Sequence, residues 1–174
     1  MLIAETERLL IRSWELTDSP HYQFMSKDIG YNCFAPPGYY LVKNAEECQE
    51  KIRQRMLLFE SRGLGKFPIF LKSTGEFLGT CGMDPYKVHG KEELELGYRL
   101  CLTHWRKGYA TEASQAVLRY GFDRLALKRI IAFAAPQNQA SLKVIQKLGF
   151  KYTGTFMHAD VQHELYELTG FTLQ

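Results

Sequence analysis

Apolar and polar positions alternate along the chain with two different periods. A period of two is typical of strands, and a period of three to four is typical of helices. In the first third of the sequence this pattern predicts a strand at 8–14 and a helix that begins at Thr17 or Asp18. Two prolines and a glycine then predict a loop at 31–40, and a second helix follows at 44–61.

The rest of the chain alternates between strands and helices. Two apolar runs flank the polar turn 73–76, which predicts a hairpin. A helix after the hairpin carries Ala110, Ala113, Val117 and Tyr120 on one face. The other elements are a strand at 94–102, a central strand at 129–135, a helix at 138–149 and two strands at 150–157 and 161–170. This order predicts a mixed α/β (α+β) fold with strand–helix–strand units in its second half.

The composition is that of an ordinary folded domain, since 45% of the 174 residues are hydrophobic and 24% are charged. The chain has no repeat, linker or low-complexity segment, so we expect residues 1–174 to form a single domain. No apolar run approaches the ~20 residues needed to cross a bilayer. The first seven residues contain acids, which is unlike a signal peptide. These observations predict a cytoplasmic protein that does not bind membranes.

Charge and metal-binding residue types narrow the possible functions. The net charge is +3, with Lys and Arg interspersed among Asp and Glu, which argues against nucleic acid as a partner. Cys33, Cys48, Cys81 and Cys101 form no C-x-x-C pair, so we expect four free thiols. The five histidines match no ligand spacing, and we expect no metal.

The stretch "HWRKGYATEA" (104–113) has the features of an anion-binding loop. A strand ends before it and a helix begins within it, and the first backbone N–H groups of a helix are unpaired and lie at the positive end of the helix dipole. Gly108 lets a phosphate approach the main chain, and Arg106 and Lys107 add positive charge. The alternative is a tight loop that uses glycine for a positive φ and carries surface cations. The P-loop and Rossmann glycine patterns are both absent from the sequence.

Two segments together resemble the GNAT N-acetyltransferase family: "ELGYRLCLTHWRKGYATEA" (95–113) and "NQASLKVIQKLGF" (138–150). "TERLLIRSW" (6–14) and "STGEFLGTCG" (73–82) are similar to the branch that acetylates the N-termini of ribosomal proteins. The resemblance covers essentially the whole chain. It implies a strongly twisted, mostly antiparallel mixed sheet of about seven strands, splayed in the middle, with about four helices on its faces. It also implies acetyl-CoA as the co-substrate and an amine as the acceptor.

The resemblance assigns residues to the CoA site. Backbone N–H groups of the glycine loop would bind the pyrophosphate, and the matching residues are Arg106, Lys107, Gly108, Tyr109, Ala110 and Thr111. Two positions depart from the family motif. Trp105 replaces Gln or Arg, and Arg106 stands where close relatives often have Gly.

The pantetheine arm of CoA would lie along the preceding strand and the helix at 138–149. A strand that splays can pair with the pantetheine amides, and the family pattern places this at Leu100, Cys101 and Leu102. Asn138 would contact pantetheine, or would simply cap its helix. Lys143 would meet a CoA phosphate, or would be solvated surface.

Two residues are candidates for proton transfer. The resemblance implies that Glu95 is the general base, and the alternative is a solvent-facing acid on a strand. The tyrosine that often serves as general acid in this family is replaced by Ile145. Ser141 is then the remaining candidate, as a hydrogen-bond donor to the thioester sulfur or as an ordinary serine in the first turn of a helix.

The acceptor remains open at this stage. A protein or peptide N-terminus is the leading possibility, and the alternatives are a small amine (an antibiotic, polyamine or amino acid) or a CoA-binding module without catalysis. Phe34, Tyr39 and Tyr40 would line the acceptor site, or would pack the loop 31–40 against the protein. A monomer and a homodimer are both compatible with the sequence.

Overall fold

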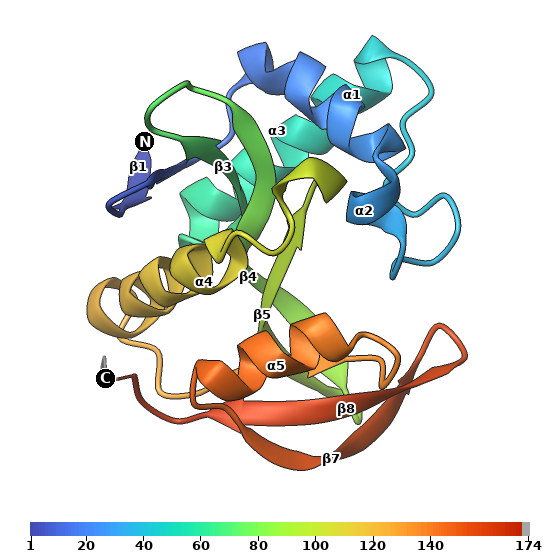
Figure 1. The fold of residues 1–174 in the computed structure, drawn as a ribbon, viewed down its shortest axis with the longest axis vertical. Coiled ribbons are helices and arrows are strands. Elements are labelled where there is room, and N and C mark those ends of the chain that lie inside the picture. Colours follow the sequence, from blue (N-terminus) through green and yellow to red (C-terminus); the bar gives the residue numbers. More distant parts are fainter. Residues whose placement is uncertain (172–174) are drawn as a thin grey trace.

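A computed structural model describes residues 1–171 and shows one open sheet of eight strands, in the order β1-β2-β3-β4-β5-β6-β8-β7 (Figure 1). Neighbouring strands are antiparallel except β5 and β6, which are parallel. The strands are β1 (Leu2–Glu5), β2 (Leu9–Arg12), β3 (Gly65–Leu71), β4 (Phe77–Val88), β5 (Lys91–Leu100), β6 (Ile130–Ala134), β7 (Lys151–His158) and β8 (Val161–Leu168).

Five α-helices within the described residues cover the two faces of this sheet. They are α1 (Ser19–Lys27), α2 (Ile29–Asn32), α3 (Ala45–Arg62), α4 (Tyr109–Arg119) and α5 (Gln139–Lys147). Capping residues mark one end of two of these helices. The Asn44 side chain accepts a hydrogen bond from the Glu47 N–H at the start of α3, and Gly149 follows α5 with a φ of 87°.

The sequence pattern predicted most elements, and it missed two. The strand expected at 8–14 is the second strand, and the short β1 pairs with it at the sheet edge. β1 has only four residues, too few for a period of two to stand out. The second is α2, which occupies the beginning of the predicted loop 31–40. The carboxylate of Asp28 starts this helix by accepting from the Tyr31 N–H at 2.8 Å.

Successive side chains of β5 point to opposite faces of the sheet, and the two faces have different surroundings. Leu96 is buried in the main core, which lies between the sheet and the helices α4 and α5. Glu95 lies on the other face, where β3 contributes Lys66 and where α1–α3 form a second core with the sheet. The parallel strands β5 and β6 share a single register pair, Glu95 with Ile131. Beyond this pair the two strands diverge, so the sheet is split at its centre.

Candidate active site

A cavity of about 530 Å³ occupies this split and reaches from α4 and α5 to the loop 31–40. It brings together most of the residues singled out in the sequence. The predicted residues that line it are Glu95, Ser141, Leu100, Arg106, Gly108, Tyr109, Ala110, Thr111, Asn138, Phe34, Tyr39 and Tyr40. Cys101, Leu102, Lys107 and Lys143 do not line it.

The predicted phosphate loop ends at the cavity as the N-terminus of α4. Gly108 is the N-cap residue with a φ of 81°, and no side chain caps the helix there. The first-turn N–H groups of Tyr109, Ala110 and Thr111 therefore have no capping partner at the wall of the cavity. Arg106 has a φ of 60°, in the left-handed region that favours glycine. This conformation gives a physical reason why a glycine often stands at this position in the family.

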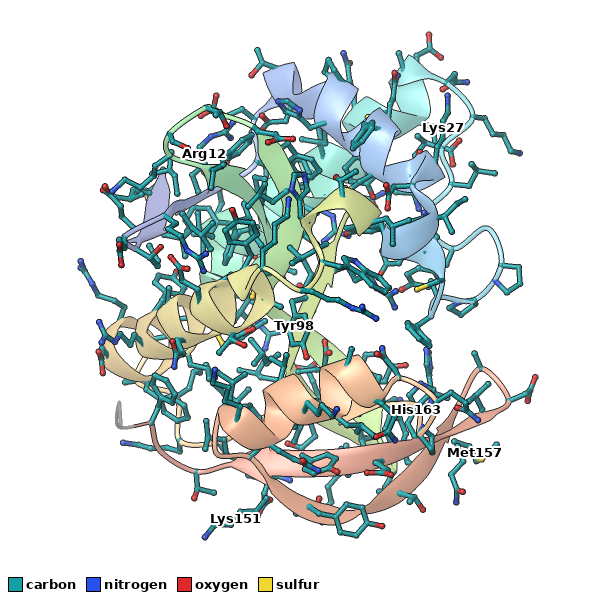
Figure 2. All side chains as sticks on the ribbon, viewed as in Figure 1. Arg12, Lys27, Tyr98, Lys151, Met157 and His163 are labelled. Atoms are coloured by element: carbon teal, nitrogen blue, oxygen red, sulfur yellow. The ribbon has the colours of Figure 1, made fainter. Side chains whose placement is uncertain are left out.

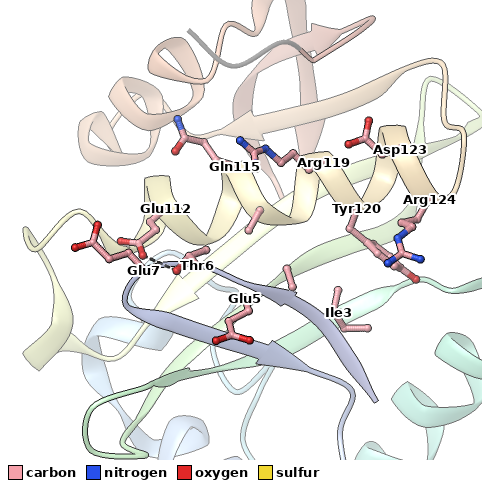
Figure 3. Close-up of a pocket in the computed structure, with 12 residues that line it drawn as sticks. Ile3, Glu5, Thr6, Glu7, Glu112, Gln115, Arg119, Tyr120, Asp123 and Arg124 are labelled. Carbon is pink, nitrogen blue, oxygen red and sulfur yellow. Dashed lines mark hydrogen bonds between the residues drawn. The ribbon is translucent and has the colours of Figure 1, made fainter.

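Polar side chains on the side away from the cavity fix the position of the phosphate loop. Arg8 donates from Nη1 to the carbonyl of Lys107 (3.1 Å) and from Nε to Glu112 (2.7 Å), and its guanidinium lies 4.6 Å from the centre of the Tyr109 ring. Thr6 donates to Glu112 at 2.5 Å beside a second cavity of about 490 Å³ between β1 and α4 (Figure 3). Burial raises the pKa of Glu112, but the hydrogen bonds from Thr6 and Arg8 outweigh it and lower the pKa. The "TER" segment of the sequence thus fixes the phosphate loop from outside the cavity.

The N-terminus of α5 forms the next part of the wall. Asn138 accepts from the Ser141 N–H at 3.1 Å, so it is an N-cap, and it also lines the cavity. The hydroxyl of Tyr98 lies 2.9 Å from Ser141 Oγ and donates to the Ser141 carbonyl at 3.1 Å. Figure 2 shows Tyr98 in the middle of the molecule, between α4 and α5. Burial raises the pKa of Tyr98, so its hydroxyl stays protonated and can donate.

Tyr98 and Lys66 are functional candidates that the sequence pattern did not indicate. Lys66 Nζ lies 2.5 Å from Glu95 Oε2 and also donates to the carbonyls of Glu95 and Gly82, and both side chains of the pair are mostly buried. Burial lowers the pKa of Lys66, but the charges of Glu95 and Asp84 outweigh it and raise the pKa. The one signal in the sequence was a single cation within the apolar strand 65–71.

A glycine makes room for this ion pair. A Cβ atom on Gly97 would lie 2.3 Å from Lys66 Nζ and 2.7 Å from Glu95 Oε1. The carboxylate and the ammonium group therefore occupy the space above Gly97, on the face of β5 opposite to Tyr98 and Ser141. A proton acceptor and a hydroxyl donor thus lie on opposite sides of the same strand.

The backbone of Leu100–Leu102, predicted to pair with pantetheine, already has partners within the protein. Trp105 Nε1 donates to the Leu100 carbonyl at 2.8 Å, and Cys101 N–H donates to the Leu78 carbonyl at 2.9 Å. Leu102 N–H donates to Asp28 at 3.1 Å. The part of β5 whose edge has no partner strand begins just after the Glu95–Ile131 pair and precedes Leu100 in the chain.

The predicted acceptor loop closes the other end of the cavity. Arg99 donates to the carbonyls of Tyr31 (3.1 Å) and Phe34 (3.4 Å), and its guanidinium lies 5.1 Å from the centre of the Tyr40 ring. The Tyr39 and Tyr40 rings meet edge to face at 4.8 Å. Tyr39 and Tyr40 thus pack against each other, and Phe34, Tyr39 and Tyr40 all line the cavity. That they bind the acceptor stays a prediction.

The family model described as "Acetyltransferase (GNAT) domain" matches residues 8–151. The chain belongs to the GNAT acetyltransferase family. Members of this family are acetyl-CoA-dependent N-acetyltransferases, and this protein is an enzyme of that class. The eight-stranded split sheet agrees with the expected fold, with β1 as a strand beyond the seven anticipated.

Three similar proteins illustrate the relationship. The chain is 34% identical over 153 residues to the uncharacterized N-acetyltransferase p20 of Bacillus licheniformis, covering 86% of this chain and 82% of p20. It is 38% identical over 100 residues to the uncharacterized protein YkkB of Bacillus subtilis (strain 168), covering 58% of each. The structure superposes with a TM-score of 0.82 on RimL, a ribosomal L7/L12 alpha-N-protein acetyltransferase in complex with coenzyme A, at 19% identity over 97% of this chain and 98% of that one. A likeness at this identity shows a shared fold.

Three further expectations concern cysteines, metals and membranes. All four cysteines are free, as predicted, and burial raises the pKa of Cys101 to about 12. Residues 1–171 contain no group of three or more His, Cys, Asp or Glu side chains arranged to hold a metal ion. Over the same residues, no helix has both the length and the apolar character needed to span a membrane.

Proposed function

We propose that the protein transfers the acetyl group of acetyl-CoA to a primary amine that reaches the split sheet from the Glu95 face of β5, with the N-terminal amine of a peptide or protein as the favoured acceptor. One observation carries this proposal. The uncapped N-terminus of α4, the Lys66–Glu95 pair and the Tyr98–Ser141 pair all meet in one cavity.

The residues around the α4 N-terminus fit an acetyl-CoA phosphate. Free N–H groups and the positive end of the helix dipole favour an anion, and Arg106 adds a full charge. In this assignment Gly108–Thr111 hold the pyrophosphate and Asn138 faces the pantetheine arm. Lys107 and Lys143 then act only at long range, since neither lines the cavity. Acetyl-CoA supplies the acetyl group as an activated thioester.

The groups that accept and donate protons lie on opposite faces of β5. Glu95 accepts the proton of the incoming amine, directly or through a water molecule, and Lys66 holds the carboxylate in place. As the amine attacks the acetyl carbonyl carbon, N–H groups on the unpaired edge of β5 stabilise the negative charge that develops on the carbonyl oxygen. Ser141 donates a hydrogen bond to the departing sulfur when the Tyr98 hydroxyl turns its proton from the Ser141 carbonyl to Ser141 Oγ, 2.9 Å away.

The chemistry favours an acceptor that is easy to deprotonate. An α-amine has a pKa of about 8 and a lysine-like amine one of about 10.4, so an α-amine needs much less help at neutral pH. A thiol has a pKa of about 8.5, so the leaving group needs only a hydrogen bond and no strong acid. The name of RimL, which acts on a protein N-terminus, points the same way.

An acceptor screen with acetyl-CoA tests the proposal. N-terminal peptides, their N-blocked counterparts and small amines are incubated with the enzyme, and the release of CoA thiol is measured together with the mass of the product. We expect acetylated peptide from the free N-termini and none from the blocked peptides. Acetylation confined to small amines would contradict the assignment of the acceptor.

A further inference from the structure

The acceptor end of the cavity has a wall of four aromatic rings, each from a different strand. Tyr86 (β4), Phe133 (β6), His158 (β7) and His163 (β8) all line the cavity. The Phe133 ring lies 4.9 Å from the Tyr86 ring, 6.0 Å from the His158 ring and 5.5 Å from the His163 ring. Figure 2 shows His163 on β8, away from Tyr98 and on the side of the acceptor loop. Aromatic side chains therefore make up much of this wall.

The polar atoms of this wall are largely satisfied by one another. The Tyr86 hydroxyl is hydrogen-bonded to His158 Nδ1, and His163 Nδ1 donates to the Val161 carbonyl at 2.9 Å. Burial and the nearby His163 and Arg99 lower the pKa of His158, so its ring is neutral at pH 7. A ligand at this end of the cavity thus meets a wall made largely of aromatic rings.

The carboxylates of the cavity are already matched by cations. Asp84 and Glu95 are the only acidic residues among those that line it in the described part of the chain. Glu95 is paired with Lys66 at 2.5 Å, and Asp84 Oδ2 lies 4.0 Å from Arg55. The other oxygen of Asp84 is buried and has no hydrogen-bond partner among the described residues. Arg99 adds a further positive charge, so the acceptor end has no surplus negative charge.

We infer that this site, if it acts as proposed above, selects a primary amine that carries a single positive charge on a ring-sized apolar group, and that it rejects polycationic amines. The amine reaches Glu95 and loses its charge in the reaction, while the apolar group packs against Phe133 and its neighbours. A second ammonium group would be buried without a counter-charge, which is strongly disfavoured. An arylalkylamine and a peptide that begins with an aromatic residue share this chemistry.

Steady-state kinetics with matched amines test this inference. The acceptors are 2-phenylethylamine, ethylamine, spermidine, and two tripeptides that begin with phenylalanine or glycine. We expect kcat/KM for each ring-bearing acceptor to exceed that of its small counterpart by about tenfold or more. Spermidine should be the poorest substrate. The better of phenylethylamine and the phenylalanine peptide identifies the source of the ring.

Variants connect the selectivity to the wall. Phe133→Ala should bring the ratio of kcat/KM for phenylethylamine over ethylamine close to one. Tyr152→Ala removes an exposed tyrosine of β7 that does not line the cavity, and should leave this ratio as it is in the wild type. Phe133→Leu keeps an apolar side chain and should give an intermediate ratio, even if the alanine variant folds poorly.

The outcomes separate the two proposals. Turnover of spermidine at or above the rate of phenylethylamine would overturn the inference and leave acetyl transfer to amines intact. Equal kcat/KM for ring-bearing and small acceptors would do the same. Failure to acetylate any of the five amines while acetyl-CoA binds would overturn the proposed function together with the inference.

Discussion

Replacing Lys66 with methionine tests whether Lys66 and Glu95 form a buried ion pair that stabilises the folded protein. Methionine matches the length of the lysine side chain and removes its charge. The exposed fractions of the Lys66 and Glu95 side chains are 16% and 12%, so solvent screens the pair poorly. Lys66→Met leaves the Glu95 carboxylate buried without its cation, and it also removes the donor to the Gly82 carbonyl.

The size of the effect follows from this burial. Removing one partner of a buried ion pair costs about 3–5 kcal/mol of unfolding free energy. This pair is partly exposed, so we expect about 3 kcal/mol, near the lower end of that range. The loss should shrink as the pH falls from 7 towards 5. An unpaired buried carboxylate binds a proton more readily in the folded protein than in the unfolded chain, so acid favours the folded variant.

Urea unfolding at several pH values measures the loss. Lys87→Met removes an exposed lysine from the same sheet and should cost little. The double variant Lys66→Met/Glu95→Gln should recover at least about 1 kcal/mol relative to Lys66→Met, because the unpaired charge is then gone. A cost below about 1 kcal/mol for Lys66→Met, with no pH dependence, would refute the idea that the pair is buried and coupled.

Three further predictions concern the other parts of the site. Gly108→Val should weaken CoA binding in calorimetry by about tenfold or more, or ~1.4 kcal/mol. Gly90→Val, at a similar φ of 78° but in an open turn, should not change CoA affinity, and equal effects would point to backbone strain alone. Tyr98→Phe should lower kcat a few-fold to about tenfold, the value of one hydrogen bond, without raising KM for acetyl-CoA; an unchanged kcat would remove Tyr98 from the mechanism. Since burial lowers the pKa of His158 in the folded state, the unfolded chain binds protons first, and stability should fall as the pH drops below about 6.5. Urea unfolding at pH 7.5 and 5.5, values about one unit to either side of the ordinary histidine pKa, should show a smaller drop for His158→Phe; an equal drop would assign it to other groups.

Local patterns in the sequence were enough to predict the main elements and the two helix N-termini at the cavity. Gly108 lies at the start of α4 with a positive φ, and Asn138 caps the start of α5. The alternation of β5 placed Glu95 and Tyr98 on opposite faces of the strand. These features depend on residues that are close together in the sequence.

The partners across the sheet could not be predicted in the same way. Lys66 is 29 positions from Glu95, and Tyr98 is 43 positions from Ser141. Their contacts depend on the register between strands and on the packing of α5, neither of which has a local signal. The partners of the Leu100–Leu102 backbone likewise come from Trp105, Leu78 and Asp28, so the unpaired edge of β5 became visible only in the folded chain.

The pH–rate profile of Glu95→Gln tests the central claim most directly, because glutamine keeps the shape and hydrogen bonding of glutamate but cannot accept the proton. General-base catalysis is typically worth about 10²–10⁴-fold, so we expect kcat at neutral pH to fall by this factor with the affinity for acetyl-CoA unchanged. The deficit should shrink as the pH approaches the pKa of the acceptor, about 8 for an α-amine and about 10.4 for a lysine-like amine, because the free amine needs no base. Wild-type kcat at neutral pH in Glu95→Gln would contradict the account.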